Sequence, residues 1–225
     1  MATGDQFSLT LKNESTTPNL SLVVYTAVPT ATNLSSMFAL AWLVKRVNTG
    51  NSVTYRWTLD FSLMFGTQGV ESGAVWSETG TVNVNDSSIA QNTATLGYPN
   101  GDYTLTLSPG ANPVRPGHVF LNTTAQVPPY SAVSGPSVAL AIATGDSNTP
   151  TPAVAGGSGP NLQHEFDLHP TYYIAAGNII QGTMADMDTV TKMQKVEYKP
   201  GIFAAAWTLT EQNIWIPGKV PALAR

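Results

Sequence analysis

The densest group of titratable side chains in this 225-residue chain is the segment His164-Glu165-Phe166-Asp167-Leu168-His169. A zinc-protease helix needs its two histidines four residues apart, and here the second follows five residues after the first. In a β-strand, Glu165, Asp167 and His169 would instead share one face. These ligands suit a divalent metal ion, but alternate strand positions stand ~6.6 Å apart, so a second strand would have to contribute. The sequence leaves open an ion site or an exposed polar strand face.

Other patterns that could support catalysis are weaker. Asp186 and Asp188 have the spacing of a general acid and base pair, although a solvated turn is the simpler interpretation. Ser158 is flanked by glycines, but Pro160 stands where the nucleophile elbow of a hydrolase has its last glycine. The glycine motifs that bind phosphates and dinucleotides are absent. Because the chain has no cysteine and no histidine pair at ligand spacing, we expect a non-enzyme without cofactor or essential metal.

Aromatic side chains could stack on sugars. Trp76 and the pair Tyr172-Tyr173 lie in segments flanked by polar residues, so we expect them to be exposed and to offer a platform for a carbohydrate. Trp215, in Asn213-Ile-Trp-Ile216, fits either an exposed or a buried position. The tryptophans within apolar segments are expected in the core: Trp42, Trp57 and Trp207.

The charge content is unusually low. Asp, Glu, Lys and Arg make up 11% of the chain, against ~25% in ordinary soluble domains. Apolar residues at 42% argue against disorder, so the polar surface must consist largely of Thr, Ser, Asn and Gln. With roughly one charge per 400 Å² of expected surface, a neighbour could cover large areas at little desolvation cost. The alternative is a Thr-rich β-domain whose surface contacts nothing.

Composition argues against nucleic acid as a partner and against a membrane-spanning segment. A pI near 5.2 with ten basic residues provides no stripe to neutralise phosphates. The longest apolar run, Met37 to Val44, is far short of the ~20 residues that span a bilayer. The N-terminal residues show no basic stretch followed by an apolar run. We therefore expect a cytoplasmic protein, or one exported without an N-terminal signal peptide.

Apolar residues recur with a period of two along nearly the whole chain. The clearest case is Tyr55 to Phe65, where every second residue is apolar and places Leu59 on the buried face. Leu20 to Val28 and Phe38 to Val47 are apolar on both faces, as in central strands covered on both sides. Further strands are predicted at 7–11, 80–84, 93–97, 103–107, 119–127, 138–144, 164–174, 190–198, 202–209 and 214–216. Helical periodicity is nearly absent, so we predict a single all-β domain, an antiparallel two-sheet β-sandwich of jelly-roll type.

Two segments stand outside this pattern. Residues 145–160 are rich in Gly and Pro and predict a long loop, and residues 217–225 predict an extended C-terminal tail. Both segments, with the apolar residues before the tail, are the ones we expect to reach a neighbouring subunit. The proposed assembly contacts are Gly145, Pro150, Pro152, Pro160, Ile214, Trp215, Pro217 and Leu223.

Part of the chain resembles a known family. The segment Ala39 to Val47, the strand from Val53 onwards to Gly69 and the ending Trp207 to Trp215 resemble the RhiA-type rhizosphere-expressed proteins of soil bacteria. The resemblance implies a cytoplasmic bacterial protein made under population-density control, without established enzymatic activity or catalytic residues. The charge-poor surface, the Gly/Pro-rich loop and the apolar tail favour a structural protein that self-associates into a filament, lattice or inclusion. A lectin-like, carbohydrate-binding module is the alternative.

Overall fold

The computed structural model describes residues 6–27, 30–32, 37–131, 134–145, 148–185 and 193–220. In these residues the regular structure is all β, apart from one 3-10 turn, η1 (Pro99–Gly101). The strands are β1 (Phe7–Asn13), β2 (Ser21–Ala27), β3 (Thr30–Thr32), β4 (Phe38–Arg46), β5 (Ser52–Gly66), β6 (Gly80–Val84), β7 (Thr93–Gly97), β8 (Thr104–Leu107), β9 (His118–Thr123), β10 (Ser137–Thr144), β11 (Thr149–Gly157), β12 (Gln163–Asp167), β13 (Thr171–Gly177), β14 (Met184–Ala185), β15 (Gln194–Val196), β16 (Ala204–Leu209) and β17 (Trp215–Pro217). The predicted all-β class is confirmed.

These strands form two sheets. The larger has 12 strands in the order β15-β13-β2-β4-β11-β10-β5-β1-β16-β17, with β14 on β4 and β6 on β5. The smaller has 5 strands in the order β3-β12-β9-β7-β8. Two pairs, β1 with β16 and β7 with β9, are parallel, so the prediction of purely antiparallel pairing is wrong there. Neither pair is joined by a hairpin, and only a hairpin would impose the antiparallel direction.

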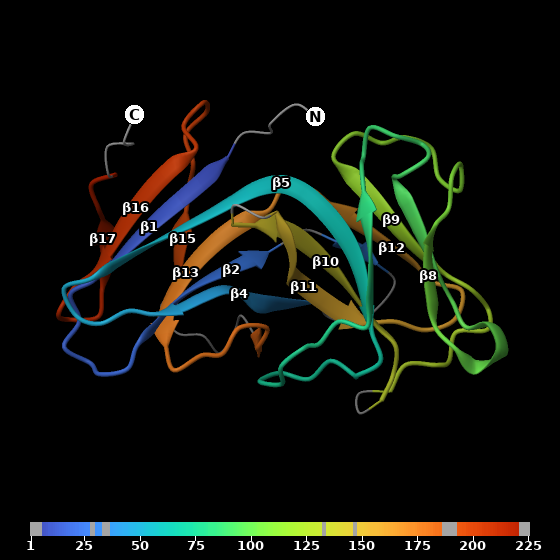
Figure 1. Ribbon diagram of the computed structural model, residues 1–225, viewed down its shortest axis with the longest axis horizontal. Coiled ribbons are helices and arrows are strands. Elements are labelled where there is room, and N and C mark those ends of the chain that lie inside the picture. The colour runs from blue at the N-terminus through green and yellow to red at the C-terminus, as the bar shows by residue number, and fades with distance from the viewer. Residues whose placement is uncertain are drawn as a thin grey trace.

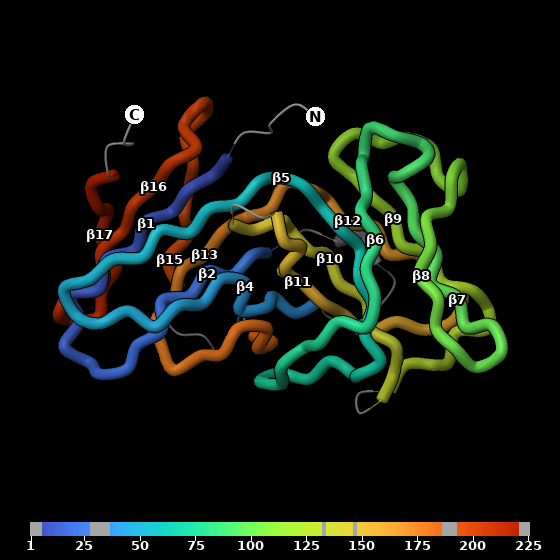
Figure 2. Tube along the Cα trace, viewed as in Figure 1, coloured from blue at the N-terminus to red at the C-terminus, as the bar shows by residue number. Residues whose placement is uncertain are grey.

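The long strand β5 arches across the molecule from one part to the other (Figure 1). Its first half pairs with β1, its second half pairs with β6, and β10 pairs with its second half as well. Figure 2 shows the chain leaving β5 through a loop and returning as β6 beside the smaller sheet. The strand predicted at Tyr55 to Phe65 is therefore confirmed and is longer than expected.

β5 carries a β-bulge between Trp57 and Phe61. These two residues lie opposite Thr144 and Ile142, so four residues of β5 advance along only two of β10. An even number of extra residues keeps Trp57 and Phe61 on the same buried face. Leu59 lies within the bulge and is 42% exposed. The prediction that Leu59 shares the buried face is wrong, because the bulge interrupts the alternation at this point.

The larger sheet curls until strands far apart in its order face one another. Trp57 donates a hydrogen bond from Nε1 to the hydroxyl of Tyr172 in β13, at 3.0 Å. Tyr198, just after β15, donates to the carbonyl oxygen of Ser8 in β1, at 3.2 Å. Trp42 and Trp57 are fully buried, as predicted, and Trp207 is partly buried. One core cluster takes in the inner face of this curl and residues of the smaller sheet.

β2 and β4 are buried on both faces, as their sequences predict. In β2, Leu22 and Val24 join the main core, whereas Val23 and Tyr25 join a second cluster on the opposite face. This second face is covered in part by β14 and the residues around it.

The Gly/Pro-rich loop predicted at residues 145–160 is instead largely a strand. β11 lies between β10 and β4 in the larger sheet, and its second half is buried. Pro150 and Pro152 fall in the half that pairs with β10 alone among the described strands, so the other edge needs no N–H there and tolerates proline. A Cβ at Gly157 would come within 2.5 Å of an aromatic ring. The small residues of β11 therefore allow close packing against neighbouring side chains. From composition alone, the same residues predict a flexible loop.

Several other strand boundaries differ from the predicted ones. The segment 164–174 forms two strands in different sheets, β12 and β13, separated by a turn that contains Pro170. β9 ends at Thr123, β16 begins at Ala204, and β17 begins one residue later than expected. The segment predicted at 190–198 lies partly outside the described residues, and β15 is the part that the structure describes.

The coarse fold class is thus all β with two sheets. A jelly-roll sandwich needs two sheets packed face to face, whereas here the larger sheet packs to a great extent against itself. The jelly-roll type therefore stays a prediction. The single-domain organisation also stays a prediction. In the part of the chain that the structure describes, no helix is long and apolar enough to cross a membrane.

Candidate functional site

A cleft of about 730 Å³ opens where the bulge of β5 meets the smaller sheet. The bulge and the following part of β5 form one wall, and β6 with the loop after it forms another. The segments before β9 and after β12 complete it. The cleft is lined by Leu59, Asp60, Phe61, Ser62, Asn83, Val84, Asn85, Asp86, Gln91, Gly117, Ala143, Asn148, Pro150, Leu168 and His169.

The bulge gives the cleft both an apolar and a charged group. Thr58 donates a hydrogen bond from Oγ1 to Oδ2 of Asp60, at 2.7 Å, and thereby fixes the carboxylate. Leu59 projects between these two residues and is exposed. A regular strand at this point would hide Leu59 in the core, so the extra residues of the bulge create this side of the cleft.

The polar walls are held by hydrogen bonds within the chain. Ser62 donates from its hydroxyl to Oδ1 of Asn83 across the β5 and β6 pair, at 2.8 Å. Asp86 accepts a hydrogen bond at Oδ2 from the backbone N–H of Gly117, at 2.7 Å, which ties the β6 loop to the start of β9. The side chains on this rim therefore have defined positions.

His169 stands at the mouth of the cleft, with its side chain 78% exposed. Its Nδ1 lies 2.6 Å from Oδ1 of Asp167. Gly117 has a φ of +77°, and a Cβ there would come within 2.6 Å of the imidazole of His169. Partial burial by itself would raise the pKa of the Asp167 carboxyl. The hydrogen bonds and charge of His169 and the charge of His118 lower this pKa by more, so the net shift is downward.

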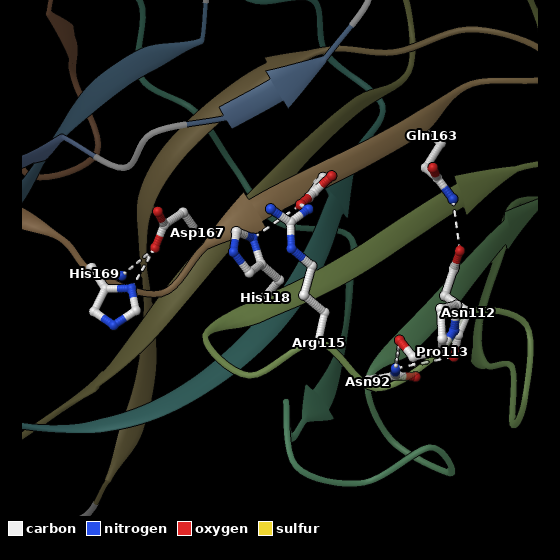
Figure 3. A network of polar contacts seen from close by, with 9 residues as sticks. Asn92, Asn112, Pro113, Arg115, His118, Gln163, Asp167 and His169 are labelled. Carbon is white, nitrogen blue, oxygen red and sulfur yellow. Dashed lines mark hydrogen bonds and ion pairs between the residues drawn. The ribbon is translucent and has the colours of Figure 1, made fainter.

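A polar network covers the outer face of β9 and β12 (Figure 3). Glu165 forms an ion pair with Arg115, and His118 Nδ1 lies 3.0 Å from the same carboxylate. The His118 Nδ1 is close enough to Glu165 for an ion pair, but the angles between the two groups do not suit a hydrogen bond. Further along, Gln163 donates to Oδ1 of Asn112, at 2.9 Å. The network joins the loop before β9 to β12.

Of the three residues predicted to share a strand face, Glu165 and Asp167 lie on one face of β12, whereas His169 lies two residues beyond the end of that strand. Glu165 turns to Arg115, and Asp167 turns to His169. In the described ranges, no three His, Cys, Asp or Glu side chains are grouped to hold a metal ion. The other candidates, Asp186 and Asp188, lie outside those ranges.

The aromatic residues predicted as a sugar platform do not form one. Trp76 is 3% exposed and donates from Nε1 to the hydroxyl of Ser137, at 2.9 Å. Tyr172 is 4% exposed and lies in the main core. Tyr173, on the other face of β13, is partly buried against the second cluster. The expected exposure of Trp76 and Tyr172 is wrong, because polar neighbours in sequence do not prevent burial under other strands.

The residues predicted as assembly contacts have mixed outcomes. Gly145, Ile214 and Pro217 are exposed. Pro150, Pro152 and Pro160 are partly buried, the first two within β11. Trp215 is 9% exposed and joins the main core, so it is not free for a neighbour, and Leu223 lies outside the described residues.

A buried serine and histidine pair lies behind β12. Ser158 Oγ is 2.9 Å from Nε2 of His164, and both residues are at most 1% exposed. Burial lowers the pKa of His164 to about 4, so the imidazole is neutral at pH 7. Its Nδ1 finds no hydrogen-bond partner in the described chain. Because neither side chain reaches solvent, this pair is part of the core.

Sequence reasoning missed the residues that build the cleft: Leu59, Asp60, Asn83, Asn85, Asp86, Gln91 and Asn148. One signal was available. Asp is rare within strands, and Asp60 in the middle of a long apolar alternation could have indicated a bulge. The other residues are contributed by loops, and their convergence depends on tertiary structure.

The fold and cleft define a class of all-β protein in which a curled larger sheet and a polar smaller sheet enclose a cleft. The chain belongs to the RhiA family, whose family model matches residues 4–217. It is 28% identical over 218 residues to Protein RhiA of Rhizobium leguminosarum bv. viciae, and the match covers 96% of this chain and 87% of that protein. The resemblance seen in the sequence is confirmed. No solved structure matches the chain.

Proposed function

We propose that this chain is a non-enzymatic structural protein that associates with copies of itself. The observation that carries the proposal is a row of exposed aliphatic side chains just before, on and after the outermost strand, β17. Ile214 is 57% exposed, Ile216 is 45% exposed and Val220 is 42% exposed. We call these three residues the C-terminal apolar patch.

The C-terminal apolar patch is suited to burial in an interface. Ile214 and Ile216 occupy alternate positions and so share a face, while Trp215 between them points into the core. Residues 202–220 contain only two charged side chains, Glu211 and Lys219. Little desolvation would therefore oppose contact with an apolar surface of a neighbour.

The rest of the surface has the same character. Ten basic and fourteen acidic side chains share 11334 Å² of accessible surface, which is about one charge per 470 Å². One side of a standard interface, about 800 Å², would bury about two charges. Hydroxyl and amide side chains can satisfy one another across such a contact.

Side-chain packing is favoured over strand addition. The N–H of Gly218 donates to the carbonyl of Ala206, so the nitrogen of the preceding Pro217 lies on the outer side of β17. Proline has no N–H to offer an incoming strand, and β17 has only 3 residues. A patch that packs on a different surface of the next copy would propagate into a filament or lattice, whereas patch against patch would close a dimer.

The test compares surface variants by analytical ultracentrifugation and negative-stain microscopy. We expect the intact chain to assemble at micromolar concentration and the double variant Ile214→Lys, Ile216→Lys to stay monomeric. A matched control is Ile89→Lys, Ile180→Lys, which changes two isoleucines that are also exposed, at 53% and 69%. A monomeric intact chain, or a patch variant that assembles as well as the control, would refute the proposal.

Carbohydrate binding stays the second candidate, without the platform predicted for it, since Trp76 and Tyr172 are buried. Cytoplasmic location and population-density control, which the family resemblance implies, also stay predictions.

A further inference from the structure

We infer that the cleft at the bulge of β5 binds a neutral polyhydroxylated ligand, a saccharide chain. This inference rests on the second candidate function, carbohydrate binding, and gives it a site and a ligand class; it does not depend on self-association. The cleft, at about 730 Å³, lies within the roughly 300 to 1,000 Å³ that is typical of ligand sites. It also lies at the junction of two sheets, where ligand sites often form between structural units.

The hydrogen-bonding groups of the cleft match hydroxyl groups. Four amide side chains line it, and each amide both donates and accepts hydrogen bonds, as a sugar hydroxyl does. Two carboxylates and one imidazole add to this set. The polar groups come from four separate segments and converge on one space: Asp60, Asn83, Asn85, Asp86, Gln91, Asn148 and His169.

An apolar surface stands beside these groups. Leu59 is 42% exposed on the bulge and supplies most of this surface, whereas Leu168, next to His169, lines the cleft but is only 8% exposed. A pyranose presents C–H groups on its faces and hydroxyls around its edge, so a site for it needs both kinds of surface. An exposed leucine beside amides supplies this combination without an aromatic platform.

The cleft is also organised before any ligand binds. Thr58 holds Asp60, and Asp86 is anchored by the backbone of Gly117. Ser62 holds Asn83 from the neighbouring strand. Groups already fixed in position lose little conformational entropy on binding, which favours recognition of a weakly interacting neutral ligand.

Charged ligands fit this lining less well. Among the described residues no Lys or Arg lines the first cleft, so an anion there would meet Asp60 and Asp86 without a fixed positive partner. Lys195, which lines the adjoining hollow, is already paired with Glu197. A polyamine has only donors to offer, and the amide N–H groups of Asn83, Asn85 and Gln91 would remain unmatched. A divalent metal lacks a suitable ligand cluster in the described residues.

A second hollow continues from the cleft and gives room for a chain. Its volume is about 490 Å³, and it shares Leu59, Leu168 and His169 with the first. Beyond these residues it follows the seam where β13 and β15 approach β1, past Phe7 and Tyr198. The two hollows together extend past the size of one sugar unit, so we assign an oligosaccharide instead of a monosaccharide.

The test measures binding by calorimetry and by a glycan array. The probes are an array of neutral oligosaccharides, with maltohexaose, cellohexaose and chitohexaose in solution, and with spermine and inorganic phosphate as charged comparators. We expect selective binding of a neutral oligosaccharide, and a loss of about tenfold in affinity for the double variant Leu59→Ala, Asp60→Ala. The control variant Val114→Ala, Asp102→Ala changes two exposed residues outside the cleft and should bind as the intact chain does.

The outcomes separate this inference from the self-association proposal. Each titration is repeated on the Ile214→Lys, Ile216→Lys variant, whose cleft is unchanged, so binding there without assembly supports the cleft alone. The inference fails if no neutral glycan binds. It also fails if spermine or phosphate binds in preference, or if the Leu59→Ala, Asp60→Ala variant keeps a native circular dichroism spectrum and full affinity.

Discussion

The two sheets of this molecule differ in how their strands are buried and in which titratable groups they carry. In the larger sheet, β2, β4, β10 and β11 are buried over most of their length, and aromatic rings fill the inside of the curl. In the smaller sheet, β8 and β12 alternate between exposed and covered positions, and polar side chains interact on the outer face. The larger sheet holds most of the buried strands, and its strands β5 and β6 also form two walls of the cleft. The smaller sheet contributes a polar outer face and the segments that close the cleft.

The division extends to the groups that titrate. All three histidines lie on or directly after β9 and β12, in the smaller sheet. The larger sheet buries tyrosines instead, and burial raises the pKa of Tyr55, Tyr172 and Tyr198 strongly, with the neighbouring Tyr172 adding to the effect on Tyr198. Loss of stability at low pH therefore reports mainly on the smaller sheet, and loss of stability at high pH reports mainly on the larger sheet.

The largest effect is expected in alkali. A phenol whose folded pKa is raised contributes full stability below its ordinary value of 10.0 and loses it as the pH rises further. Because three buried phenols act together, we expect the fold to unfold cooperatively above that pH. Phenolate absorbance and near-ultraviolet circular dichroism should change together for these residues.

Tyr198→Phe removes one of the three titrating groups and should move the alkaline midpoint to higher pH. The comparison between the sheets would break if the buried phenols ionised while the circular dichroism spectrum stayed native.

An intermediate effect is expected in mild acid. The folded pKa of His164 is lowered to about 4 from 6.5, so the unfolded chain gains its proton first as the pH falls. Stability should therefore drop by about 3 kcal/mol between pH 6.5 and pH 4, measured by urea unfolding. Asp167 adds to this only at lower pH, because its pKa is lowered from 3.8.

His164→Gln should abolish this dependence on pH, whereas His169→Gln, at an exposed position, should retain it. An unchanged slope in the His164→Gln variant would show that other groups control the acid sensitivity of the smaller sheet.

The smallest effect concerns the ion pair of Arg115 with Glu165. Its arginine side chain is 57% exposed, so Arg115→Ala should change the free energy of unfolding by less than about 1 kcal/mol, and by less again in high salt. Lys12→Ala, which breaks an exposed ion pair of the larger sheet, is the matched comparison. A much larger loss for Arg115→Ala would mean that the polar face of the smaller sheet also stabilises the fold.

The sequence predicted the strands where burial is local in origin. Alternation located β1 and β5, and unbroken apolar runs located β2 and β4 as strands covered on both faces. The prediction for β11 was wrong, because a segment of Ala, Gly and Pro residues is typical of a flexible loop. The aromatic ring that packs against Gly157 cannot be known from the local sequence. Whether a strand tolerates proline depends on whether the edge that its nitrogen faces is paired. That pairing is set by strands distant in the sequence.

The candidate site was less accessible from the sequence than the fold. The alternation of Glu165 and Asp167 on one face was predicted correctly, but their partners, Arg115 and His169, depend on the loop before β9 and the turn after β12. Periodicity does not predict the bulge, because its even number of extra residues leaves Trp57 and Phe61 on the same face. Periodicity cannot detect an irregularity that preserves its phase.

The parallel pairing of β1 with β16 has a consequence for how the protein is made. Ser8 lies opposite Ala204, so β1 can form this pair only after roughly 200 further residues have been synthesised. A ribosome that adds roughly 5 to 20 residues each second leaves β1 waiting for at least ten seconds or so, with one edge open. Such long-range pairing slows folding and leaves an unpaired strand edge exposed to other chains until β16 is available.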